Sequence, residues 1–188
     1  RLPQYDFCQL SGTLSDRKYE SEGGPGIERC AALIKEFSSR PAVDLLRLLE
    51  WVFFNLFTGN NDSHAKNLSI YHHPQHGVVL TPFYDLMCTR IYPGLSSKFA
   101  LSVGGEYRPG NIGREHVTRM AEALGSRPRY VLEVAEALAG RIAPALEGAI
   151  GDISPLLKPA GKVFAQKMQW EILRITRKNA ARMLGNRA

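Results

Sequence analysis

Apolar residues recur at helical spacing through most of the chain. Between residues 27 and 37 they fall every three or four positions, and a longer pattern of the same kind runs over residues 41–58. The second pattern covers so much of the helix surface that it predicts a core helix, and Gly59 is typical of the residue that follows a helix end. Further helical patterns are found at 115–124, from Pro128 onward, and at about 160–184 before Gly185.

A different pattern interrupts the helices in the middle of the chain. Short apolar runs at 68–71 and 78–81 predict two strands, and the segment 72–77, which contains Pro and Gly, predicts a hairpin connection between them. No internal repeat is visible. The pattern therefore predicts a mainly α fold with a central β-hairpin, as one domain over residues 1–188.

Two prolines affect the expected helix boundaries. Pro3 is compatible with the first turn of a helix. Pro144 lies inside the pattern that opens at Pro128, and we expect it to kink or end that helix because proline lacks the backbone N–H.

Composition narrows the class of protein. Charged residues make up 22% of the chain and hydrophobic residues 44%, which is typical of a soluble globular domain. No apolar run approaches the roughly 20 residues that cross a bilayer, and no secretory signal opens the chain. No C-x-x-C pair is present, so we expect buried thiols in a protein of the reducing cytoplasm, at Cys8, Cys30 and Cys88.

Positive charge is concentrated at the C-terminal end. The chain has a formal net charge of +6, and residues 160–188 hold seven Lys and Arg against Glu171 alone, which also gives +6. A solvated cationic helix face is the simple interpretation, and non-specific contact with a DNA backbone is the alternative. Such contact would use Arg174, Arg177, Lys178 and Arg182.

Residues suited to phosphoryl transfer lie at one end of the hairpin. Asp62, His64, Lys66 and Asn67 precede its first strand, and Asp85 follows its second, so we expect them to converge. Phosphoryl transfer needs a carboxylate that orients the attacking hydroxyl, and oxygen ligands that hold Mg²⁺ on the nucleotide phosphates. The D-x-x-x-x-N spacing of Asp62 and Asn67 is that of a kinase catalytic loop, and Lys66 is placed to offset phosphoryl charge.

Each candidate also has a simpler interpretation. Asp62, Asn67 and Asp85 are residue types that favour turns, although the three together favour a site. His64 is a ligand, an acid, or a residue whose ring nitrogens hold the loop by hydrogen bonds, and we favour the last role. A zinc site near the hairpin tip is disfavoured because no cysteine accompanies its histidines, which are His72, His73 and His76.

The combined motif resembles the signature of the HipA-like bacterial toxin kinases. N-x-D-x-H-A-K-N begins here at Asn60 or Asn61, L-T-P-x-Y-D covers residues 80–85, and residues 1–4 and 18–26 are also similar to that family. The resemblance implies a protein-kinase-like C-terminal lobe of the HipA type. In it Asp62 is the catalytic base, Asn67 and Asp85 ligate Mg²⁺, and His64 and Lys66 have supporting roles.

The resemblance also implies an activity and partners. It predicts an ATP-dependent serine/threonine kinase that modifies a protein, an aminoacyl-tRNA synthetase in the best-known members. Its expected partner is a small DNA-binding antitoxin of the HipB type, with operator DNA reached through that complex. Two alternatives are a non-catalytic helical module that binds antitoxin and operator DNA, and a small-molecule kinase. The second usually has a His before the base, where this chain has Asn60 or Asn61.

The N-terminal nucleotide lobe of a kinase has no counterpart in the motifs. No glycine-rich phosphate loop with a preceding strand is found, since the glycines of segment 23–26 lie too early and Pro25 removes a donor amide. A nucleotide-binding lysine is not recognised either. We therefore expect the chain to be one lobe of a longer protein, with little nucleotide binding or activity alone.

Overall fold

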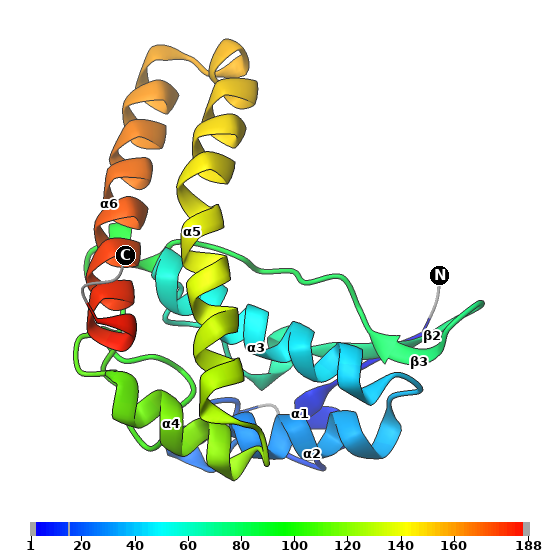
Figure 1. Ribbon diagram of the computed structural model, residues 1–188. Helices are drawn as coiled ribbons and strands as arrows, with labels where there is room; N and C mark the ends of the chain where they lie inside the picture. The colour runs from blue at the N-terminus through cyan, green and yellow to red at the C-terminus, as the bar shows by residue number, and fades with distance from the viewer. Residues whose placement is uncertain (1–2, 15, 186–188) are drawn as a thin grey trace.

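A computed structural model describes residues 3–14 and 16–185. Arg1 and Leu2, which contribute to the family resemblance, and Arg187, which contributes to the C-terminal charge, lie outside the described residues. Figure 1 shows helices gathered around α3, a small sheet on one side, and the long pair α5 and α6 projecting from the body. The elements are β1 (Gln4–Asp6), α1 (Phe7–Leu10), α2 (Ile27–Phe37), α3 (Pro41–Thr58), β2 (Ser69–His73), β3 (Gly77–Leu80), α4 (Arg114–Ala123), α5 (Pro128–Ile153) and α6 (Pro159–Leu184).

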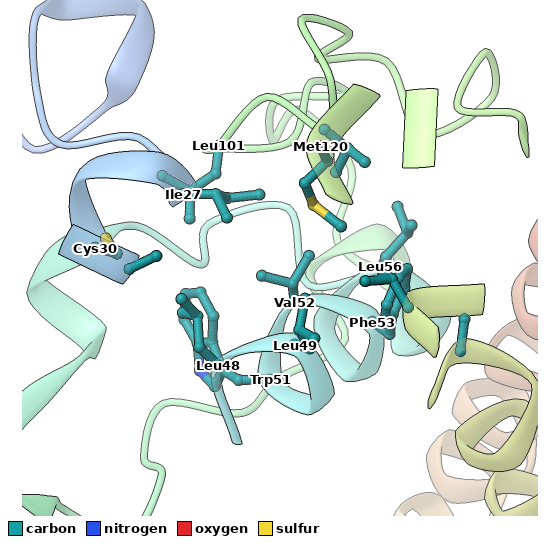
Figure 2. Close-up of a cluster of buried hydrophobic side chains, with 14 of the residues drawn as sticks. Ile27, Cys30, Leu48, Leu49, Trp51, Val52, Phe53, Leu56, Leu101 and Met120 are labelled. Carbon is teal, nitrogen blue, oxygen red and sulfur yellow. The ribbon is translucent and has the colours of Figure 1, made fainter. Parts of the chain in front are cut away.

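Helix α3 forms the centre of the hydrophobic core. Its apolar positions point in most directions, as the sequence predicts, and from Leu48 onward all of them except the partly buried Phe54 are buried, whereas Val43 near the start of the helix is exposed. Figure 2 shows α3 side chains surrounded by residues of α2, of α4 and of the segment before α4. The labelled residues are Leu48, Leu49, Trp51, Val52, Phe53 and Leu56 of α3, with Ile27, Cys30, Leu101 and Met120 around them.

Gly59 ends α3 in the left-handed conformation, with φ of 77°. A Cβ atom at this position would lie 2.6 Å from Ile175 Cδ1 and 2.9 Å from Arg90 Cγ. Glycine is therefore required for two reasons, the backbone angle and the close approach of two side chains. This turn directs the chain from α3 into the loop 60–67.

Side chains of α6 bind the backbone carbonyls at the C-terminal end of α3. The last carbonyls of a helix have no partner within the helix. Here Thr176 Oγ1 donates to the carbonyl of Phe57 at 3.1 Å, and Asn179 Nδ2 donates to the carbonyl of Leu56 at 2.9 Å. These two polar residues of α6, both buried, fix the position where the candidate loop begins.

The sheet has three antiparallel strands in the order β1-β2-β3. The hairpin of β2 and β3 is the one that the sequence predicts, with Ile70 opposite Leu80. β1 is an addition, and the expectation of a helical turn at Pro3 is wrong because the following residues pair with β2, with Tyr5 opposite Ile70. The helix starts only at Phe7, after the Asp6 side chain accepts a hydrogen bond from the Gln9 amide.

Pro144 does not end α5. The helix continues from Pro128 to Ile153 with this proline inside it. Since α6 lies antiparallel alongside α5 over this length (Figure 1), tertiary packing holds the segment helical despite the missing amide. None of the described helices is both long and apolar enough to span a membrane. The three cysteines are free and buried.

Candidate active site

The side chain of Asn67 lies between the two acidic candidates. Its Nδ2 donates to Asp85 Oδ2 at 3.0 Å and to the backbone carbonyl of Asp62 at 3.2 Å. Asn67 is buried, at 5% exposure, whereas the Asp85 side chain that it contacts is exposed. Two acidic residues 23 positions apart are thereby held together at the end of the hairpin.

Asp85 has an unusual backbone conformation. Its φ of 57° makes it the one non-glycine residue with positive φ in the described part of the chain. The left-handed region costs an L-residue about 1–2 kcal/mol, although Asp tolerates it better than most. Asn60 holds the strained backbone, since its Nδ2 donates to the Asp85 carbonyl at 3.0 Å and to Asn55 Oδ1 at 2.9 Å. Strain maintained by neighbouring contacts is common at functional sites.

Asp62 contacts residues from an earlier part of the chain. The Tyr19 hydroxyl donates to Asp62 Oδ1 at 2.6 Å, and Lys18 Nζ lies 3.9 Å from Asp62 Oδ2. Burial, and next the hydrogen bond to Asp62, raise the pKa of Tyr19 to about 12, so this phenol stays protonated and donates. The sequence did not identify either contact, and the only signal was the family likeness of segment 18–26.

His64 is buried beside Asp62, and its ring nitrogens make none of the expected hydrogen bonds to the loop in the described structure. Nε2 is 4.0 Å from Asp62 Oδ2, and Nδ1 has no hydrogen-bond partner among the described residues. The backbone holds the loop instead, because His64 N donates to the Asp62 carbonyl at 3.0 Å and the His64 carbonyl accepts from Asn67 N at 2.9 Å. Burial, and next the charge of Lys18, lower the pKa of His64, which favours a neutral ring.

Lys66 is tied into the loop through its backbone. Its carbonyl accepts a hydrogen bond of 2.8 Å from the Tyr84 hydroxyl, which also lies 2.6 Å from Ser69 Oγ. The Lys66 ammonium makes no ion pair within the part of the chain that the structure describes, and the cation beside Asp62 is Lys18.

A buried carboxylate of α3 fixes the end of the strand that leads to the site. Asp44 of α3 is fully buried, and its Oδ2 accepts from Ser38 Oγ at 2.6 Å and from Leu80 N at 3.2 Å. Arg47 lies 3.3 Å from Asp44 Oδ1 and donates to the carbonyls of Leu80 and the next residue at 2.9 and 2.8 Å. This network fixes the end of β3, from which the chain leads to Asp85.

A cavity of about 380 Å³ opens beside Asp62. Its volume admits a side chain and a short stretch of backbone, so a hydroxyl-bearing segment could reach the carboxylate from this side. Polar and apolar residues share the lining, which includes Tyr19, Asn61, Asp62, Met87, Leu95 and Phe99.

The four cationic candidates of α6 do not form one group. Arg174 is paired with Glu171 by two hydrogen bonds of 2.6 and 2.8 Å. Arg174, Lys178 and Arg182 line a second cavity, whereas Arg177 is exposed and lies outside that lining. The cationic surface is therefore divided between a concave part and an open part.

At the hairpin tip, the rings of His73 and His76 stack with their centroids 4.5 Å apart. Over residues 3–14 and 16–185, no three His, Cys, Asp or Glu side chains are grouped in a way that would hold a metal ion.

Comparison with known proteins identifies the family. A family model described as the HipA-like C-terminal domain matches residues 1–146. The chain belongs to the HipA-like C-terminal domain family. This agrees with the motif of residues 60–85, and the mainly α fold with its hairpin confirms the expected fold class.

Two curated relatives are similar to this HipA-like domain. A putative kinase Y4mE of Sinorhizobium fredii is 47% identical over 104 residues, which cover 55% of this chain and 24% of that protein. The serine/threonine-protein kinase toxin HipA of Shewanella oneidensis is 29% identical over 161 residues, 80% of this chain and 37% of that protein.

A solved structure shares the fold over almost the whole chain. It is the complex of Shewanella oneidensis MR-1 HipA with HipB and operator DNA, which matches with a TM-score of 0.83 and 26% identity. The match covers 98% of this chain and 44% of the solved chain. The HipA-like domain therefore spans less than half the length of each protein that it matches here.

Proposed function

We propose that this chain is the C-terminal catalytic lobe of a HipA-like serine/threonine kinase toxin, which transfers the γ-phosphate of ATP to a protein hydroxyl. The proposal rests on the Asn67 amide, which bonds both the Asp62 backbone and the Asp85 carboxylate. An acid, an amide and a second acid at one hairpin end are the set that phosphoryl transfer requires. The kinase names of the two relatives support it.

In this proposal Asp62 orients the attacking hydroxyl. Its side chain is 45% exposed and borders the cavity, so a substrate hydroxyl can approach it. Asp62 Oδ1 accepts a hydrogen bond of 2.6 Å from the Tyr19 hydroxyl, so this carboxylate already binds one hydroxyl group. Neutral His64 fills the space beneath the loop, and Lys66 stabilises charge on the transferred group, both as supporting residues.

Asn67 and Asp85 would hold Mg²⁺. This ion prefers oxygen ligands and usually binds through one or two carboxylates, waters and substrate phosphates. One exposed carboxylate beside one amide fits that preference, and the fixed Asp85 backbone keeps the carboxylate in place. When bound, the ion would neutralise charge on the nucleotide phosphates.

The proposal also concerns the longer protein of which this domain would be one part. We propose that residues 1–188 form the HipA-like C-terminal lobe and that the nucleotide lobe lies outside them, on the same or another polypeptide. By family resemblance, the partners are a HipB-like antitoxin and, through it, operator DNA in the cytoplasm. The substrate would be an aminoacyl-tRNA synthetase.

A non-catalytic module that binds antitoxin and operator DNA is the second candidate. It is favoured by the solved neighbour, whose complex contains HipB and DNA, and by the cationic residues of α6. A module that only binds antitoxin and DNA does not require the strained backbone of Asp85 or its hydrogen bond to Asn67, so these features favour the kinase.

Calorimetry of Mg²⁺-ATP separates the two candidates. The chain is titrated alone and with the upstream lobe, as the unmodified protein, as Asp85→Ala, and as the control Asp152→Ala, which changes an exposed carboxylate of α5. Binding that needs both the upstream lobe and Asp85 supports the kinase. Absence of binding in every combination, or equal binding by Asp85→Ala, contradicts it.

A further inference from the structure

The second cavity has a volume of about 310 Å³ and lies where α6 passes the end of α3. Asn61 lines this cavity and also the one beside Asp62, so the two are neighbours. Its cationic side chains come from three separate segments, namely the turn Thr89–Ile91, the loop before α4, and α6. They are Arg90, Arg108, Arg174, Lys178 and Arg182.

The cavity has a large excess of positive charge. Glu171 neutralises Arg174, and five cations minus this one carboxylate leave four positive charges. Another nearby acid, Glu106, accepts from the Arg108 amide at 2.8 Å and from Asn111 Nδ2 at 3.1 Å, and so holds the loop. In the described structure, Arg108 and Lys178 make no ion pair, so their charges are available to a ligand.

Two of the guanidinium groups are held in place before any ligand arrives, and a third arginine is fixed at its backbone. Arg174 is fixed by its two bonds to Glu171. Arg182 Nη1 donates to the carbonyl of Pro109 and to Asn179 Oδ1, each at 3.2 Å. The Arg90 amide donates to the Gly59 carbonyl at 3.2 Å, and the Cβ and Cγ atoms of Arg90 lie close to Gly59. Guanidinium groups fixed around a concavity recognise phosphate oxygens in pairs.

We propose that this cavity binds a small phosphate-bearing ligand, either a phosphate monoester or a pyrophosphate. A volume of 310 Å³ is suited to the phosphate-bearing end of a small molecule or side chain, whereas the backbone of a DNA duplex contacts an open surface. The proposal goes beyond the kinase function, because Asp62, Asn67 and Asp85 do not line the cavity. The phosphate comes either from a free small molecule or from a phosphorylated side chain of a protein.

The test compares two double variants with the same loss of charge. Arg108→Gln/Lys178→Gln removes two exposed cations of the cavity, and Arg177→Gln/Lys162→Gln removes two exposed cations of α6 outside it. Affinity is measured by calorimetry with inorganic pyrophosphate, with a phosphoserine peptide and with the same peptide unphosphorylated. We expect the first variant to lose at least about tenfold in affinity and the second to change less than about twofold.

The affinities of the probes decide whether the cavity is a phosphate site. Tighter binding of pyrophosphate assigns a free ligand, tighter binding of the phosphoserine peptide assigns a protein-borne phosphate, and both support the site. Equal losses in the two double variants would show diffuse attraction to the basic helix and overturn the proposal. It is also overturned if neither phosphate probe binds saturably at millimolar concentration, including the case in which only a DNA duplex binds.

Discussion

Asp44 is the residue whose removal should most directly disturb the support of the candidate site. Its carboxylate is fully buried and joins the start of α3 to the end of β3. Asp44→Ala leaves the Ser38 hydroxyl and the Leu80 amide without their acceptor, and it leaves Arg47 without its anion. Of these three groups, the Leu80 amide is the most deeply enclosed.

The expected loss follows from these contacts. Removing one partner of a buried ion pair costs about 3–5 kcal/mol, because the remaining charge and donors are left unsatisfied. The Arg47 side chain is 26% exposed and keeps its bonds to two carbonyls, so part of its charge remains solvated. We therefore expect Asp44→Ala to lower the free energy of unfolding by about 3 kcal/mol. Asp44→Asn keeps an acceptor but loses the charge, and should lose about half as much.

Urea denaturation followed by circular dichroism measures this loss. The control Asp152→Ala removes an exposed carboxylate of α5 and should change the free energy of unfolding by less than about 0.5 kcal/mol. A loss below about 1 kcal/mol for Asp44→Ala would mean that this network does not hold the end of β3 in place.

Three further variants test individual contacts. Gly59→Ala should cost about 2 kcal/mol or more in urea denaturation, because its Cβ would meet Ile175 and Arg90, whereas Gly125→Ala, at φ of 70° in open space, should cost about 1. Equal losses would contradict the packing argument. Tyr19→Phe should lower the unfolding free energy by less than about 1.5 kcal/mol, since its acceptor Asp62 is 45% exposed, and a loss above about 3 would contradict this. The lowered pKa of His64 means that the folded state binds fewer protons than the unfolded chain, so its contribution to stability is complete above pH 6.5 and decreases below it. His64→Gln should lose less stability than the unmodified chain between pH 7.5 and 5.5, and equal losses would contradict the assignment.

The sequence was sufficient where structure is local. The bounds of α2 and α3 follow from apolar spacing and from Pro41 and Gly59, which mark the ends of α3. Asp62, Asn67 and Asp85 lie together because one short hairpin connects their segments, so the pattern of strands was enough to bring them close.

Contacts between distant segments could not be read from the sequence. Tyr19 reaches Asp62 across 43 positions, and Asp44 reaches the amide of Leu80 across 36. β1 has only three residues and is held by pairing with β2, so no local pattern predicts it.

The basic helix shows the same limit in another form. On the sequence its four cations are equivalent, because helical spacing alone cannot tell which of them faces a cavity. Arg177 is separated from the others only because loops elsewhere in the chain bring Arg90 and Arg108 against one side of α6.

Transfer of labelled γ-phosphate from Mg²⁺-ATP to a serine-containing protein substrate is the decisive test of whether Asp62 belongs to a kinase active site. The chain is assayed with its upstream lobe as the unmodified protein, as Asp62→Asn, and as the control Asp152→Asn. We predict transfer by the unmodified protein and the control, and a loss of at least about a hundredfold in Asp62→Asn, as expected for a general base. Equal transfer by Asp62→Asn, or none by the unmodified protein with its upstream lobe and bound nucleotide, would contradict it.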